Sequence, residues 1–170
     1  MKLLLSNTTD KEEVFKTVEQ FLHLHDLSIS KKDDQRPWGG FFVINEDESK
    51  HFIETFFADA ATKINVSNKL SPKILIVAPY KRLSWQYHFR RAEIWKLIGG
   101  EAGVVTSDSD EENETTFLNI GDVIQLKQGE RHRLIGIDHW GIIAEIWQHT
   151  NPDHPSDEDD IIRLQDDFGR

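Results

Sequence analysis

Gln86-Tyr-His88-Phe-Arg-Arg-Ala-Glu93 is the segment with which the prediction of the fold begins. Gln86 and His88 are two residues apart, so a β-strand would direct both side chains to the same face. Glu93 follows after a gap of four residues, which suits a turn between two strands. We therefore expect an amide, an imidazole and a carboxylate to lie close together on one side of a sheet.

A second segment supplies another imidazole, because Gly121 and Gly129 precede His132, which opens a further predicted strand. In a closed barrel this histidine would meet the first group, giving a mixed nitrogen and oxygen site that suits Zn, Fe, Mn, Ni or Co. The chain has no cysteine, so thiolate ligands and disulfides are excluded. The sequence predicts one divalent transition metal, bound by Gln86, His88, Glu93 and His132.

From Lys73 onward, short β-rich runs alternate with turn residues. The expected strands are Ile74–Ala78, Glu93–Ile98, Gly103–Thr106, Thr115–Leu118, Asp122–Leu126, His132–Ile137 and Ile142–Gln148. Two of the predicted turns are Gly99-Gly100 and Asp138–Gly141. Many short strands with regular turns indicate an all-β sandwich or barrel. The charged end, Ser156–Arg170, is expected to form a short helix or a strap over the barrel.

The part of the chain before the barrel is predicted to begin with an amphipathic helix at Thr9–His25, capped by Thr9 with Glu12 three residues on. Its buried face would consist of Val14, Val18, Phe21 and Leu22. The elements expected next are a polar linker at Ser28–Gln35, a strand at Phe41–Ile44 and a second helix at Ser49–Ala61. We divide the chain into residues 1–35, the helix and linker, and residues 36–170, the barrel with its strap.

The overall charge limits the classes of partner. A chain of 170 residues fits one domain, and its formal net charge of -10 argues against binding nucleic acid or an anionic membrane. A small anionic substrate stays possible, since a few arginines in a pocket reverse the local sign. The apolar run in Met1–Ser6 is too short for the core of a signal peptide, and no later stretch approaches a membrane span. We expect a cytoplasmic protein.

The ligand spacing resembles the two motifs of the cupin family, G-x5-H-x-H-x(3,4)-E-x6-G and G-x5-P-x-G-x2-H-x3-N. Here they read Tyr80-x5-Gln86-x-His88-x4-Glu93-x6-Gly100 and Gly121-x5-Lys127-x-Gly129-x2-His132-x3-Gly136. The resemblance implies an all-β cupin barrel (a double-stranded β-helix, or jelly roll) with an added N-terminal helix and a second short helix.

Three longer motifs resemble the C-terminal domain of type II mannose-6-phosphate isomerases, which are often fused to mannose-1-phosphate guanylyltransferase. The motifs are Arg36-Pro-Trp-Gly39, Leu83-Ser-Trp-Gln-Tyr-His-Phe-Arg-Arg-Ala-Glu-Ile-Trp95 and Glu158-Asp-Asp-Ile-Ile-Arg-Leu-Gln-Asp-Asp-Phe-Gly-Arg170. The resemblance implies an aldose–ketose isomerase acting on a sugar phosphate such as mannose 6-phosphate, with zinc as the first choice of metal. It also implies a phosphate anchored by Arg36, Arg163 and Arg170.

Two residues are candidates for a catalytic role. Glu145 lies on a late predicted strand with Trp147 on the same face. If that face points inward, Glu145 is a candidate base; otherwise it is a packing or ion-pair residue. Arg170, which the family-like tail could bring to the barrel mouth, is the second candidate.

Two other functions stay open. Arg90 and Ile94 replace histidines of the family, which favours a cupin that binds a sugar or small acid without turnover. A metal-dependent oxygenase is the third possibility, because the fold alone does not decide the chemistry. Strand edges are usually covered, and the chain is rich in Trp and Phe, so we expect a homodimer.

Overall fold

Two long strands, β5 (Arg91–Ser107) and β8 (Arg131–His149), run antiparallel and form the centre of the sheet. In the computed structural model, which describes residues 5–170, each of them replaces two of the predicted strands. Gly99-Gly100 and Asp138–Gly141 were expected to be turns, but both lie inside these strands, at or opposite shifts of the β5–β8 register. Gly100 has a φ of +68°, and a Cβ there would lie 1.6 Å from the carbonyl oxygen of Trp140. Gly100 therefore allows a β-bulge within a continuous strand, at a position where a side chain would clash.

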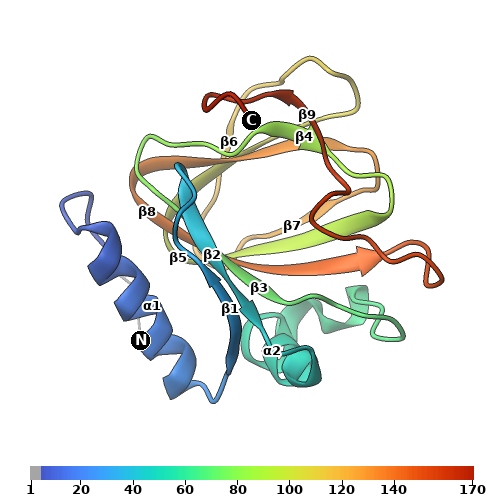
Figure 1. Ribbon diagram of the computed structural model, residues 1–170, viewed down its shortest axis with the longest axis horizontal. Coiled ribbons are helices and arrows are strands. Elements are labelled where there is room, and N and C mark those ends of the chain that lie inside the picture. The colour runs from blue at the N-terminus through green and yellow to red at the C-terminus, as the bar shows by residue number, and fades with distance from the viewer. Residues whose placement is uncertain (1–4) are drawn as a thin grey trace.

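Seven shorter strands complete the sheet in the described part of the chain. They are β1 (Ile29–Asp33), β2 (Gly39–Ile44), β3 (Lys73–Val77), β4 (Trp85–Tyr87), β6 (Thr116–Phe117), β7 (Val123–Leu126) and β9 (Ile162–Gln165). The order along the main path is β1-β2-β3-β8-β4-β9, and β5 pairs with β6, β7 and β8. Figure 1 shows these strands curving around into a barrel, with helix α1 on one outer side. The predicted all-β class is confirmed.

Helix α1 (Lys11–Leu24) carries the predicted apolar face. Val14, Val18, Phe21 and Leu22 are buried in a core cluster shared with Phe42 of β2. The cap is one residue later than expected, because the Asp10 carboxylate, not Thr9, accepts from the backbone N–H of Glu13. Asp is a stronger N-cap than Thr, and the shift removes Glu12 from the capping position.

The stretch predicted to be a linker, Ser28–Gln35, contains strand β1, which pairs antiparallel with β2. Helix α2 (Ser49–Phe56) ends before the predicted Ala61, and a 3₁₀ turn at Ala58–Lys63 follows it. One core cluster lies between the two helices and the sheet, and a second fills the inside of the barrel around Trp95, Leu97 and Ile143.

The C-terminal segment crosses over β4 as strand β9, whose Arg163 pairs with Gln86 (Figure 1). Of the two expected forms, helix or strap, the structure has a strap that contains a strand. No helix in residues 5–170 is long and apolar enough to cross a membrane. The first four residues of the Met1–Ser6 run, on which the signal-peptide prediction rests, lie outside the described part.

Candidate functional site

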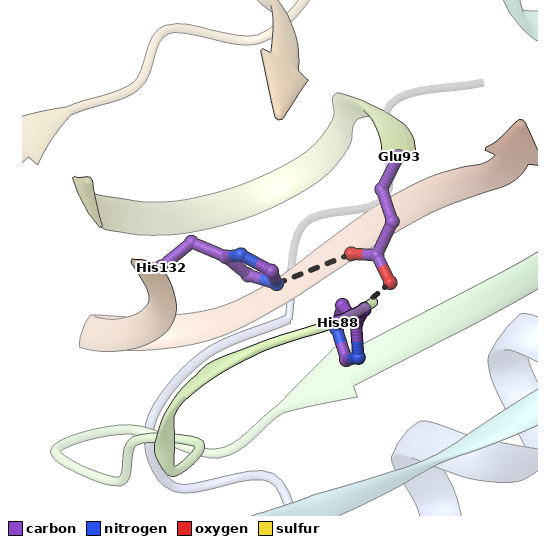
Figure 2. A group of neighbouring side chains, drawn as sticks. All are labelled: His88, Glu93 and His132. Carbon is purple, nitrogen blue, oxygen red and sulfur yellow. Dashed lines mark ion pairs between the residues drawn. The ribbon is translucent and has the colours of Figure 1, made fainter. Parts of the chain in front are cut away.

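The structure brings together His88, directly after β4, Glu93 on β5 and His132 on β8 (Figure 2). The Nε2 atom of His88 lies 3.2 Å from Glu93 Oε1, and the Nε2 atom of His132 lies 3.3 Å from Glu93 Oε2. Each of the three side chains is at most 2% exposed. The strand alternation predicted from the sequence agrees with this meeting. In a closed sheet every second residue of a strand points inward, so inward residues of facing strands come close together.

The other ring nitrogen of each histidine contacts a backbone carbonyl. His88 Nδ1 lies 2.6 Å from the Asp160 oxygen, and His132 Nδ1 lies 2.9 Å from the Glu130 oxygen. A carbonyl only accepts, so each Nδ1 carries the proton and, in a neutral ring, Nε2 directs its lone pair toward Glu93. This is the arrangement by which metal-binding histidines are usually oriented.

Glu93 and His132 form one half of the group. Among the described residues, Glu93 Oε2 and His132 Nε2 are buried and have no hydrogen-bond partner. Burial alone would lower the pKa of His132. The contact with Glu93 raises this pKa, because the negative carboxylate stabilises a positive charge on the imidazole. A proton or a metal ion supplies that charge. The donor set of two imidazoles and a carboxylate therefore fits a divalent transition metal.

The remaining two members have pKa values that suit ligands at neutral pH. Burial lowers the pKa of His88 to about 4, so its ring is neutral. Burial would raise the pKa of Glu93, but the interactions with His88, with the Arg91 guanidinium and with His132 hold it well below the usual value. The carboxylate is therefore ionised.

Gln86, the fourth predicted ligand, lies on β4 directly opposite His132 of β8. Its Oε1 atom accepts a hydrogen bond of 2.6 Å from Ser84 Oγ. The role of Gln86 as a ligand stays a prediction.

Arg91 is a member of this site that the sequence prediction missed. Its Nε atom lies 2.7 Å from Glu93 Oε1, and its Nη2 atom lies 3.2 Å from His88 Nε2. The side chain is 5% exposed. The sequence did contain a signal for Arg91. On a strand, residues i and i+2 lie on the same face, so the spacing Arg91-Ala-Glu93 places Arg91 on the face of Glu93.

A cavity of about 360 Å³ opens next to the ligand group, and Glu93 belongs to both. All the predicted catalytic and substrate-binding residues lie in its wall, as do Arg91 and Lys73. The charged lining consists of Arg36, Lys73, Arg91, Glu93, Glu145, Glu158, Asp159, Arg163 and Arg170. Cationic side chains outnumber acidic ones here, whereas the chain as a whole has a net charge of -10.

Glu145 lies on β8 between Lys73 of β3 and Trp95 of β5, and its side chain faces inward. The indole Nε1 of Trp95 donates a hydrogen bond of 2.9 Å to Glu145 Oε1. Burial, and then the charge of Glu93, raise the pKa of Glu145 to about 7. Lys73 and Arg91 oppose this rise. A carboxyl group with this pKa exchanges protons readily at neutral pH.

The three arginines that were predicted to bind phosphate differ in their partners. Arg36 Nε lies 2.9 Å from Asp33 Oδ2, and Arg170 Nε lies 2.8 Å from Asp166 Oδ2. Arg163 has no hydrogen bond or ion pair from its side chain among the described residues. Its pKa is lowered by burial and by the neighbouring charge of Arg170. Arg163 is therefore the guanidinium of this group that is available to an anion.

Lys73, which the sequence prediction also missed, is 5% exposed. Its Nζ atom contacts Glu158 and lies 3.8 Å from the centre of the Trp147 ring. No pattern in the sequence distinguishes this lysine from a solvated strand residue, because its position depends on how β3 meets β8.

Known proteins are similar to this chain over most of its length. The sequence model of a family described as mannose-6-phosphate isomerase C-terminal matches residues 54–166. Mannose-1-phosphate guanylyltransferase of Salmonella montevideo is 25% identical over 169 residues, which cover 99% of this chain and 30% of that protein. The alginate biosynthesis protein AlgA of Pseudomonas aeruginosa is 33% identical over 110 residues, 63% of this chain and 21% of that protein. The chain thus spans less than a third of the length of these relatives.

Solved structures are similar in fold. The capsular polysaccharide assembling protein CapF of Staphylococcus aureus superimposes with a TM-score of 0.51 at 12% identity, over 82% of this chain and 34% of that chain. Oxalate decarboxylase of Lactobacillus farciminis superimposes with a TM-score of 0.52 at 22% identity, over 83% of this chain and 34% of that chain. These likenesses confirm the predicted barrel.

Proposed function

The chain belongs to the mannose-6-phosphate isomerase C-terminal family and has the cupin fold, and from this premise we propose that it is a metal-dependent aldose–ketose isomerase acting on a sugar phosphate such as mannose 6-phosphate. The observation that carries the proposal is Glu145, a buried carboxyl group with a pKa of about 7 in the wall of the cavity that Glu93 also lines. Aldose–ketose exchange moves a proton between C1 and C2 of the sugar through an enediol. A group that accepts and returns that proton works best when its pKa lies near the operating pH.

The surroundings of Glu145 support its role as the proton carrier. Trp95 holds one carboxyl oxygen by a hydrogen bond, so the orientation of the group is fixed. Lys73 lies opposite Glu145 in the register of β3 and β8, and its positive charge favours the ionised form. Ionised Glu145 takes the proton from the sugar carbon, and the protonated form returns it to the neighbouring carbon.

The arginines give the cavity its selectivity for a phosphate ester. Arg163 has its guanidinium free of partners among residues 5–170, and burial together with the Arg170 charge makes a bound anion favourable. A guanidinium binds phosphate through two parallel charge-assisted hydrogen bonds. Arg36 and Arg170 extend this positive region, each with an aspartate beside it.

A divalent metal, with zinc as the first choice, would be held by His88, Glu93 and His132, with Gln86 as the proposed fourth ligand. When bound, it would polarise the oxygens of the sugar and stabilise negative charge that develops on them. Glu93 would hold the metal at the edge of the cavity that Glu145 and the arginines line.

The assay that tests the proposal uses the purified full chain, loaded in turn with Zn²⁺, Mn²⁺ and Co²⁺. We expect conversion of mannose 6-phosphate to fructose 6-phosphate, measured by a coupled assay, and loss of conversion after Glu145→Gln with metal content unchanged. If no aldose or ketose phosphate is converted with any of the metals, the isomerase proposal is wrong.

A second candidate is a cupin that binds a sugar phosphate without turnover. The occupation of Glu93 Oε1 by Arg91 favours it, because a ligand atom that is already paired is less available to a metal. Calorimetry with mannose 6-phosphate separates the two, since binding without conversion supports the second.

We also propose that the protein forms a cytoplasmic homodimer. Strand β9 ends the sheet order and exposes Ile162 and Leu164. Light scattering at micromolar concentration tests the dimer. We expect a mass of twice 19.7 kDa, and a monomer mass would contradict the proposal.

A further inference from the structure

Arg91 places a positive charge on the ligand atoms of the candidate metal site. Its guanidinium donates to Glu93 Oε1 at 2.7 Å and to His88 Nε2 at 3.2 Å. These two acceptor atoms face one another at 3.2 Å. One half of the ligand group is therefore satisfied by the guanidinium, while Glu93 Oε2 and His132 Nε2 on the other half are without a hydrogen-bond partner in the described residues.

The guanidinium is held firmly from its other side. Its Nη1 atom donates to Ser156 Oγ at 2.8 Å and to the Asp157 carbonyl at 3.0 Å. Its Cζ atom lies 3.7 Å from the centre of the Trp147 ring. An arginine does not lose its proton under physiological conditions, so this charge stays in the site at every working pH.

We propose that Arg91 is a built-in competitor of the metal. The inference rests on the metal centre of the proposed function. The one lone pair on His88 Nε2 serves either the guanidinium or a metal ion, and a metal on the facing oxygen of Glu93 would lie beside the positive charge of the guanidinium. Metal uptake through His88 Nε2 therefore needs Arg91 to give up its hydrogen bond to that atom, and the guanidinium charge beside Glu93 repels the metal, so the affinity is lower than the ligand set alone would give.

The same contacts connect the metal site to the strap. Ser156 and Asp157, which hold the guanidinium, lie shortly before strand β9, which carries Arg163. If the guanidinium moves away from Glu93, its positive charge is no longer paired with that carboxylate next to Ser156 and Asp157, where the strap begins. Arg91 thus links the occupancy of the metal site to the segment that we propose binds phosphate.

The test is the affinity for Zn²⁺ of the metal-free full chain, measured by titration against a chelator of known strength. Arg91→Gln removes the charge, and we expect binding at least about tenfold tighter than that of the wild type. Arg91→Lys keeps one charge in a single ammonium group that does not bridge both atoms, so a smaller increase is expected. The matched control is Arg90→Gln, because Arg90 pairs with Asp157 at 3.2 Å and not with the ligands. It should bind Zn²⁺ as the wild type does.

Circular dichroism identifies any variant that does not fold, and if Arg91→Gln fails this check, Arg91→Lys decides by the direction of its change. Weaker binding in the Arg91 variants would mean that Arg91 orients Glu93 for the metal, which overturns the competitor role. Equal affinities in the wild type and all variants overturn it as well.

The outcome is separable from that of the isomerase proposal. Equal affinities in a wild type that converts sugar phosphate contradict only the role of Arg91. Tighter binding by Arg91→Gln in a protein that converts no sugar phosphate supports Arg91 as a competitor and contradicts only the isomerase.

Discussion

The indole of Trp95 donates a hydrogen bond of 2.9 Å to the carboxyl group of Glu145, from one long strand to the other inside the barrel. The bond stabilises the ionised form of Glu145 and so opposes the burial that raises its pKa to about 7. Trp95 is therefore one of the groups that set the pH at which Glu145 accepts a proton, together with burial and the charges of Glu93, Lys73 and Arg91.

Replacing Trp95 by Phe should shift the pH profile of isomerisation. Without the donor, the pKa of Glu145 rises further, and the base form is populated only at higher pH. The rising limb of kcat against pH should move to higher pH in Trp95→Phe. A limb that stays in place, or moves to lower pH, would mean that the bond does not tune the base.

The metal site should depend on both imidazoles. The wild type is expected to bind about one metal ion per chain, and the double variant His88→Ala with His132→Ala is expected to lose it, because only Glu93 remains of the three converging side chains. Elemental analysis of the purified proteins measures this. His139→Ala, which removes a half-exposed histidine outside the site, should keep its metal. Unchanged metal content in the double variant would refute the ligand assignment.

Phosphate recognition should depend on Arg163. We expect Arg163→Ala to raise the KM for the sugar phosphate about tenfold, which corresponds to one charge-assisted hydrogen-bond pair. Arg82→Ala is the control, because Arg82 pairs with Asp167 at 2.7 Å and lies outside the cavity lining. Equal KM values for the two variants would contradict the assignment of Arg163. Deleting Gly169 and Arg170 should weaken binding while leaving the metal in place.

The strap should depend on Asp160. Its buried carboxylate accepts hydrogen bonds from Ser156 Oγ and from the backbone N–H groups of Phe89 and Arg90. Asp160→Asn replaces one acceptor oxygen by a donor, so the free energy of unfolding should fall by about 1.5–3 kcal/mol. Urea denaturation measures this, and the exposed Asp159→Asn is expected to change it by less than about 0.5 kcal/mol. Equal stabilities in the two variants would show that the carboxylate does not secure the strap.

The convergence of His88, Glu93 and His132 could be predicted because strand alternation and motif spacing are local properties of the sequence, whereas their role as metal ligands stays a prediction. His88, Glu93 and His132 met as the spacing indicated. The lengths of the strands could not be predicted, because Gly99-Gly100 looks like a turn until the approach of Trp140 shows why a bulge needs glycine. Arg91 and Lys73 escaped prediction for a related reason. Their burial depends on Trp147 and on the strap, which come close only after the barrel has closed.

The central claim, that Glu145 moves a proton at the sugar carbon, is tested most directly by proton NMR in D₂O. With the metal-loaded wild type, the signal of the C2 proton of mannose 6-phosphate should disappear as the sugar is converted, because Glu145 removes that proton and either delivers it to C1 or exchanges it with the solvent. Glu145→Gln, with its metal content and phosphate affinity retained, should leave that proton in place. Loss of the C2 proton at the wild-type rate in Glu145→Gln, or a C2 proton that stays in place in the wild type, would contradict the account.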